Sequence, residues 1–67
     1  MKGPYGPYRL TEKSIDEHVP EGCSGTYELL TLRLGHARYV GESLMDLNER
    51  LKEHLGEGYT HFRFIID

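Results

Sequence analysis

The stretch from residue 25 to residue 55 constrains most strongly how this 67-residue chain can fold. It holds two short segments of alternating side chains, residues 26–34 and 37–41, joined at Gly35 and His36. Alternation with a period of two is typical of strands, and a glycine at the join favours a tight turn. The two segments therefore predict a β-hairpin with Tyr27 and Tyr39 on neighbouring strands.

A helix is expected directly after the hairpin. Four leucines recur at helical spacing and form its predicted buried stripe: Leu44, Leu47, Leu51 and Leu55. Ser43 is the expected N-cap, and Asp46 three residues later suits the positive end of a helix. Gly56 is expected to end the helix in a left-handed conformation.

Two more elements flank this unit. Residues 11–19 predict a short helix, in which Ser14 and Glu17 form a capping box and Pro20 stops the helix. Residues 59–66 alternate again and predict a third strand.

The N-terminal residues 1–10 contain two Gly-Pro-Tyr units. Proline fixes the backbone and glycine frees it, so this segment is expected to be an extended or turn-rich arm. The arm is either a loose terminus or a segment whose Tyr5 and Tyr8 lie across the surface of the domain or of a partner. The remaining residues, 11–67, are expected to form one domain, because a chain this short supports no more.

These elements predict an α+β fold. It consists of a three-stranded antiparallel sheet with one main amphipathic helix and a short N-terminal helix.

Charge and composition narrow the function classes. Eleven acidic residues outnumber eight Lys and Arg, and the net charge is −3. Because nucleic-acid backbones are bound mainly through Lys and Arg, this balance argues against non-specific nucleic-acid binding, although a local basic face is compatible with it. The single cysteine, Cys23, rules out an internal disulfide. No apolar run approaches membrane-spanning length, so we predict a cytoplasmic protein without membrane contact.

Three motifs occur in a fixed order along the chain. They are Gly25-Thr26-Tyr27, then Tyr39-Val40-Gly41, then the helix sequence Asp-Leu-Asn-Glu-Arg-Leu-Lys-Glu-His-Leu at residues 46–55. Their combination resembles the core of the GIY-YIG nuclease superfamily. The resemblance covers about residues 25–64.

The resemblance also bears on the surface of the sheet. No position in the chain matches the two helices that normally complete a domain of this family, so the sheet face that they would cover is expected to stay apolar. The apolar residues of this face are expected to be some of Leu30, Leu32, Phe62, Phe64 and Ile66. Exposed apolar patches mark association surfaces, so we predict a homodimer through the sheet or its edge.

The resemblance implies a metal-dependent nuclease site that cuts phosphodiester bonds. Tyr27 and Tyr39 would lie at the scissile phosphate, one of them as general base. Arg50 would stabilise charge on the phosphate, and His54, one helical turn later, would assist on the same face. Mg²⁺ or Mn²⁺ would be the cofactor if the module is active.

The chain departs from the family pattern at three points. Thr26 stands where the family usually has isoleucine, which is a mild change. Glu42 adds negative charge beside the expected phosphate site, and no position matches the family's metal-binding glutamate. Catalysis would then need a carboxylate from Asp67, Glu57 or a second subunit. The leading prediction is a minimal GIY-YIG-like module that binds or cuts DNA. The alternative is a non-catalytic protein-interaction module on a remnant nuclease fold.

Each site residue also has a structural interpretation. Tyr27 and Tyr39 could be half-buried aromatic residues paired across the hairpin. Arg50 could pair with Asp46 on a solvated face. His54 could be an ordinary surface histidine.

Overall fold

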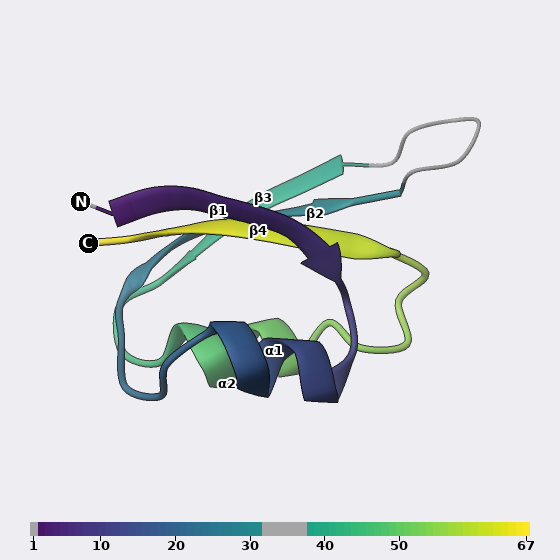
Figure 1. The fold of residues 1–67 in the computed structure, drawn as a ribbon. Coiled ribbons are helices and arrows are strands. Elements are labelled where there is room, and N and C mark those ends of the chain that lie inside the picture. The colour runs from purple at the N-terminus through teal and green to yellow at the C-terminus, as the bar shows by residue number, and fades with distance from the viewer. Residues whose placement is uncertain (1, 32–37) are drawn as a thin grey trace.

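The fold is a sheet covered by helices on one face, in a computed structural model that describes residues 2–31 and 38–67. The elements follow in the order β1 (Lys2–Arg9), α1 (Glu12–His18), β2 (Gly25–Leu30), β3 (Arg38–Ser43), α2 (Leu47–Lys52) and β4 (His61–Ile66). The sheet is antiparallel with strand order β1-β4-β2-β3. Both helices lie on the same side of it (Figure 1). The α+β prediction is confirmed, and the prediction of three strands is wrong because the sheet has four.

The additional strand is β1, which the sequence assigned to an arm. Tyr5 pairs with Phe64 and Tyr8 with Phe62, with register shifts before and after Tyr5. Gly3 and Gly6 have positive φ angles of 115° and 102°. A side chain at either position would lie 2.8 Å from a carbonyl oxygen of β4. Each Gly-Pro-Tyr unit thus forms one irregular step of an edge strand, where proline is tolerated.

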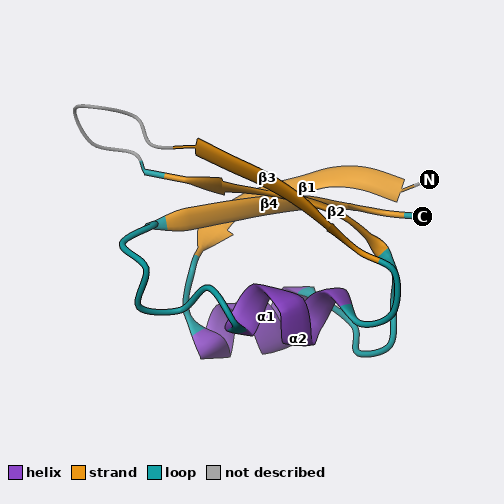
Figure 2. Ribbon diagram, turned by 180° about the vertical axis from the view of Figure 1, so that it is seen from behind, coloured by secondary structure: helices purple, strands orange, loops and turns teal. Residues whose placement is uncertain are grey.

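The core lies between the sheet and the two helices (Figure 2). The alternation predicted for residues 26–34 and 59–66 holds in β2 and β4, where every second residue faces the helices. The buried apolar residues are Leu10, Ile15, Val19, Tyr27, Leu29, Leu47, Leu51, Phe62 and Phe64. Phe62 and Phe64 were among the five candidates for the uncovered apolar face, and neither belongs to it, because β4 turns both toward the helices.

The N-cap of each helix lies three residues away from the residue that the sequence predicted. For α1 the N-cap is Thr11, whose Oγ1 accepts a hydrogen bond from the Ser14 N–H at 3.1 Å. For α2 the N-cap is Asp46 rather than Ser43. Ser43 ends β3, and its Oγ accepts from the Asp46 N–H at 3.1 Å. The serine therefore supports the turn that leads into the helix.

The predicted leucine stripe is only partly present. Leu47 and Leu51 are fully buried, and Leu55 packs against the core from its edge. Leu44 precedes the helix and is 80% exposed. Gly56 has the predicted positive φ of +88°, but the prediction that it ends the helix is wrong, because α2 already ends at Lys52 and its C-cap is Glu53.

Asn48 connects the two helices. Its side chain is buried, and its Nδ2 donates to Val19 O at 2.8 Å and to Asp16 Oδ1 at 3.2 Å. Lys52 adds an ion pair to Asp16 at 2.7 Å. These contacts fix α1 against α2 and so determine where the residues after α2 lie.

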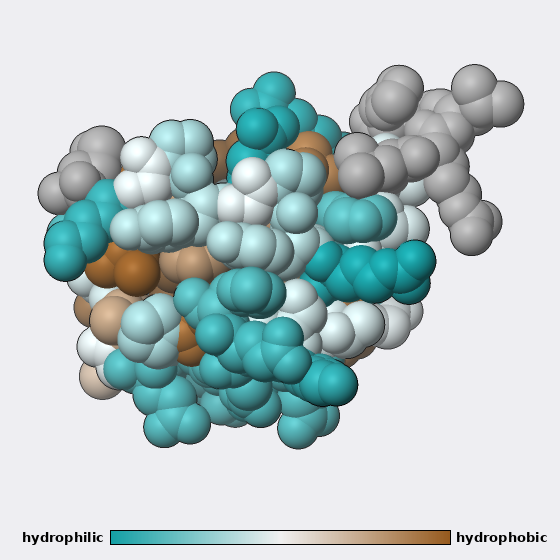
Figure 3. Space-filling model, in the orientation of Figure 1, coloured by the Kyte–Doolittle hydropathy of each residue, from teal (hydrophilic) through white to brown (hydrophobic). Residues whose placement is uncertain are grey.

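The sheet face opposite the helices carries both charged and apolar side chains along β2, β3 and β4. Glu28 lies between Arg38 and Arg63 and forms ion pairs with both. An open hollow of about 400 Å³ lies on this face, and its lining includes Thr26, Glu28, Leu30, Arg38, Val40, Arg63 and Ile65. The surface seen over β1 and α1 is also mostly hydrophilic, with hydrophobic atoms showing mainly between the helices and the sheet (Figure 3).

The expected turn at Gly35 and His36, together with Leu32 and Ala37, lies outside the described residues. Within the described part of the chain, neither helix has the length and apolar character needed to cross a membrane.

Candidate functional site

The site is built around Tyr27, which β2 places on the helix-facing side of the sheet. Its side chain is only 1% exposed. The phenol crosses over Gly41 of the paired strand β3. A Cβ at Gly41 would lie 2.5 Å from the Tyr27 hydroxyl oxygen, so glycine at this position leaves the space that the phenol occupies. The hydroxyl thereby reaches the residues of α2 and the turn after it.

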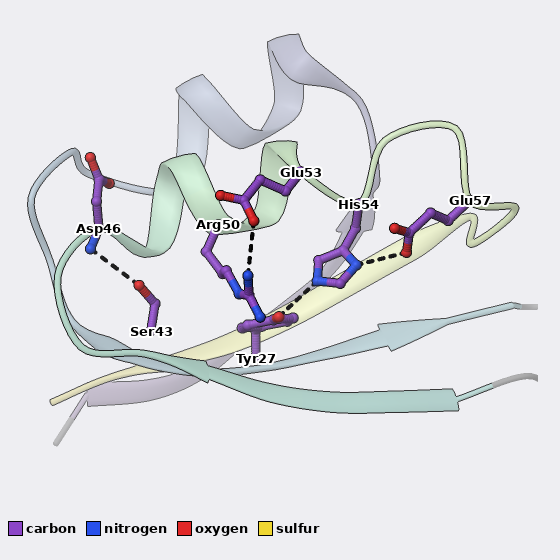
Figure 4. A network of polar contacts seen from close by, with 7 residues as sticks. All are labelled: Tyr27, Ser43, Asp46, Arg50, Glu53, His54 and Glu57. Atoms are coloured by element: carbon purple, nitrogen blue, oxygen red, sulfur yellow. Dashed lines mark hydrogen bonds and ion pairs between the residues drawn. The ribbon is translucent and has the colours of Figure 1, made fainter.

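The Tyr27 hydroxyl contacts His54, which lies in the turn that follows α2. The Tyr27 hydroxyl and His54 Nε2 are 2.8 Å apart, and His54 Nδ1 lies 2.7 Å from Glu57 Oε1 (Figure 4). An ionised carboxylate can only accept hydrogen bonds, so Nδ1 carries the proton that faces Glu57. In the neutral ring Nε2 is then the acceptor, and Tyr27 donates its hydroxyl proton to it.

Arg50 approaches the same hydroxyl from α2. Its Nη1 donates to Glu53 Oε1 at 2.8 Å, and its guanidinium lies beside the Tyr27 oxygen (Figure 4). Burial raises the pKa of the Tyr27 phenol, and its hydrogen bond with Arg50 acts in the opposite direction. Hydrogen bonds to Glu53 and then to Tyr27 raise the pKa of Arg50. The guanidinium is therefore a permanent cation at the site.

Tyr39 completes the group on its solvent side. The centre of its ring is 5.1 Å from that of His54 and 6.2 Å from that of Tyr27. It is one of the exposed large hydrophobic residues of the chain. Tyr39 and Arg50 thus present an aromatic ring and a cation to solvent, while Tyr27 lies beneath them.

The structure brings together all four residues that the sequence singled out. Tyr27 comes from β2, Tyr39 from β3, Arg50 from α2 and His54 from the following turn. Their roles in chemistry stay predictions. The structural interpretation of Arg50 named the wrong partner, because it pairs with Glu53 and not with Asp46.

Two glutamates, Glu53 and Glu57, hold Arg50 and His54 in place. Sequence reasoning named Glu57 only as a source of metal-binding carboxylate and did not single out Glu53. The spacing of three residues from Arg50 to Glu53 and from His54 to Glu57 was the available signal.

Glu42, which was expected to add negative charge beside the site, pairs with Thr26 in the strand register. Because it follows Gly41 on β3, its side chain belongs to the opposite face of the sheet.

The residues present do not fit a Mg²⁺ or Mn²⁺ site. Mg²⁺ needs oxygen ligands, usually one or two carboxylates. The carboxylates nearest the site, Glu53 and Glu57, are held by Arg50 and His54. Asp67 lies past the end of β4, where its N–H donates to Ser24 O. Among the described residues, no three potential ligands of the His, Cys, Asp or Glu type form a group.

Comparison of the chain with models of protein families, with curated proteins and with solved structures gives no match.

Proposed function

We propose that the chain is a GIY-YIG-like module that binds the phosphodiester backbone of DNA through Tyr39 and Arg50, with His54 supporting them from below. The observation that carries this proposal is that an exposed guanidinium and an exposed phenol stand over a relay of hydrogen bonds whose central residues, Tyr27 and His54, are buried. The relay runs from Glu57 through His54 to Tyr27 and ends beside Arg50.

The guanidinium can exchange its present partner for a phosphate. Arg50 and Glu53 form an ion pair between two solvent-exposed side chains, 43% and 57% exposed. Pairs of this kind contribute about 0–1 kcal/mol. A phosphate offers arginine two parallel hydrogen bonds and a higher charge, so it can compete for this group.

The relay serves to hold the binding surface in place. Glu57 orients His54, and His54 holds the Tyr27 hydroxyl beside the guanidinium. Because burial raises the pKa of Tyr27, the phenol stays protonated near neutral pH. A protonated phenol is a hydrogen-bond donor and a poor base. We therefore propose that the site binds phosphate, and cleavage is tested by a separate experiment.

The test is binding of a short DNA duplex, measured by fluorescence anisotropy over a series of salt concentrations. The affinity of the wild type is expected to fall as salt rises, because phosphate contacts release counterions. Arg50→Gln is expected to weaken binding by about tenfold, which corresponds to the loss of about 1.4 kcal/mol for one charge-assisted contact. The same variant should also make the slope of the logarithm of affinity against the logarithm of salt concentration shallower by about one unit.

Arg63→Gln is the matched control. Arg63 has the same charge, a similar exposure of 45% and an ion pair to a glutamate, but it lies on the opposite face of the sheet. Equal losses in the two variants, or binding that does not respond to salt, would contradict the proposal.

Cleavage is tested by plasmid nicking with Mg²⁺ or Mn²⁺, comparing the wild type with Arg50→Ala. Nicking by the wild type that disappears in the variant extends the function to that of an endonuclease. A lack of nicking in both proteins restricts the function to binding.

A protein-interaction module is the second candidate. The observation that favours it is the turn between β3 and α2, where Leu44 and Met45 are 80% and 83% exposed. Large exposed apolar side chains next to each other are typical of contact surfaces. Salt-independent behaviour in the DNA experiment would favour this function.

A further inference from the structure

The two edges of the sheet differ in how well they are protected. Edge strands offer unpaired N–H and C=O groups to other chains, and proteins block them with proline or with irregular steps. The β1 edge carries Pro4 and Pro7, and its register shifts twice. The β3 edge, Arg38–Ser43, has no proline and pairs with β2 in continuous register over all six residues.

The residues of β3 form a pattern that is complementary to itself. Arg38, Val40 and Glu42 alternate on the face opposite the helices, with a cation at one end and an anion at the other. Val40 lies at the centre of the three and is 56% exposed. Glu42 makes no ion pair with any of the residues that the structure describes.

A second copy of the strand fits this pattern in one antiparallel register. If Val40 faces Val40 of the second copy, Arg38 faces Glu42 of that copy at both ends of the contact. Opposite charges directly across an antiparallel pair are favourable, and like charges are unfavourable. The arrangement has two-fold symmetry, which is the usual symmetry of a homodimer.

We propose that β3 is the dimerisation edge and that two copies pair through it, in the register centred on Val40, into one continuous eight-stranded sheet. The occupant of this edge is a second copy and not an unrelated strand, because the charges of β3 complement those of β3 itself. The pairing does not depend on the proposed DNA binding.

The same register changes the candidate site. Tyr39 of the second copy faces Gly41, the residue over which the Tyr27 phenol crosses. A two-fold axis perpendicular to the sheet places the helices of both copies on the same side. Each copy therefore adds the aromatic ring of Tyr39 beside the other copy's site.

The first measurement is the mass in solution by sedimentation equilibrium over a range of protein concentrations. The wild type is expected to shift reversibly from 7.7 kDa toward twice that mass as concentration rises. A mass of one chain at all concentrations up to the millimolar range would overturn the proposal.

Charge exchange tests the register. Arg38→Glu places two acidic residues opposite each other at both ends of the contact, and Glu42→Arg places two basic residues there. Each variant alone is expected to dimerise at least about tenfold more weakly, since two ion pairs become repulsive. A mixture of the two variants restores opposite charges at both ends, so it is expected to form heterodimers with nearly the affinity of the wild type.

Two controls separate pairing from folding. Arg63→Glu makes the same charge change and loses the same partner, Glu28, but it lies inside the sheet on β4, so dimerisation should stay unchanged. Circular dichroism establishes that each variant is folded. Should Arg38→Glu fail to fold, Val40→Lys places two cations at the two-fold axis and must also abolish dimerisation. If Arg38→Glu or Glu42→Arg alone dimerises as strongly as the wild type, or if the mixture of the two stays monomeric, this register is ruled out.

Discussion

The contacts of Tyr8 with His18 and of Tyr27 with His54 both connect the sheet to the helices, and these two pairs are built differently. On one side Tyr8 of β1 stacks on His18 of α1, with ring centres 3.7 Å apart and an angle of 6° between the planes. On the other side Tyr27 of β2 meets His54 after α2, with ring centres 5.4 Å apart and planes tilted by 53°. The first is a contact of ring faces, and the second is a hydrogen bond of 2.8 Å.

The carboxylate beside each histidine differs in the same way. Glu17 lies 4.0 Å from His18 Nε2, whereas Glu57 lies 2.7 Å from His54 Nδ1. His18 is exposed, and His54 is buried. The same residue types therefore form a solvent-exposed stack in one place and a directed polar relay in the other. Only the second arrangement fixes a proton at a defined atom, which is why the candidate site is assigned there.

The largest difference in stability between the two pairs is expected when the hydroxyl group of each tyrosine is removed. Tyr27→Phe leaves the buried Nε2 of His54 without a donor, and an unsatisfied buried polar atom costs about 1–3 kcal/mol. Tyr8→Phe keeps the ring stack and is expected to change the free energy of unfolding by less than about 0.5 kcal/mol. Urea denaturation of both variants measures the two values, and equal losses would contradict the contrast between the pairs.

Much of the sheet and helix pattern could be predicted because it depends on local spacing. The alternation of Phe62 and Phe64, and the burial of Leu47 and Leu51, follow from periods of two and 3.6 residues. β1 could not be predicted in this way. Its Gly-Pro-Tyr units are poor strand formers locally, and they pair only because Gly3 and Gly6 fit closely against the backbone of β4. Such a contact is a property of the folded chain and not of the segment.

The candidate site shows the same limit. The motifs named Tyr27, Tyr39, Arg50 and His54, and the fold brings these residues together. The complete burial of Tyr27 was not predicted, because it depends on the space over Gly41 and on α2 packing above it. The spacing of three residues from His54 to Glu57 was compatible with their contact but did not establish it. That contact requires the turn in which Gly56 and Gly58 both have positive φ angles.

A smaller difference is expected when the two carboxylates are neutralised. Glu57→Gln removes the charge from the acceptor of His54 Nδ1–H, and the amide oxygen can still accept a weaker bond. The free energy of unfolding should fall by about 0.5–1 kcal/mol. Glu17→Gln should have almost no effect, because its contact with His18 is long and lies between exposed groups.

Nitrogen NMR of the imidazole rings gives a second measure of the same contrast. His54 of the wild type is expected to carry its proton on Nδ1 in the neutral ring, held there by Glu57. A His54 proton on Nε2 would contradict the direction that we assign to the relay.

The smallest effect is expected at alkaline pH and concerns Tyr27 alone. Burial raises its pKa above the ordinary value of 10.0 because the phenolate is disfavoured inside the fold. Between the unfolded and folded pKa values the native state binds more protons than the unfolded state, so stability falls as pH rises. The contribution of Tyr27 is therefore fully present below pH 10 and is lost above it. The stability of the wild type should decline more steeply above this pH than that of Tyr27→Phe. The difference in phenolate absorbance between the two proteins isolates this group, and a difference curve with its midpoint below pH 10 would show that Tyr27 is not buried as the relay requires.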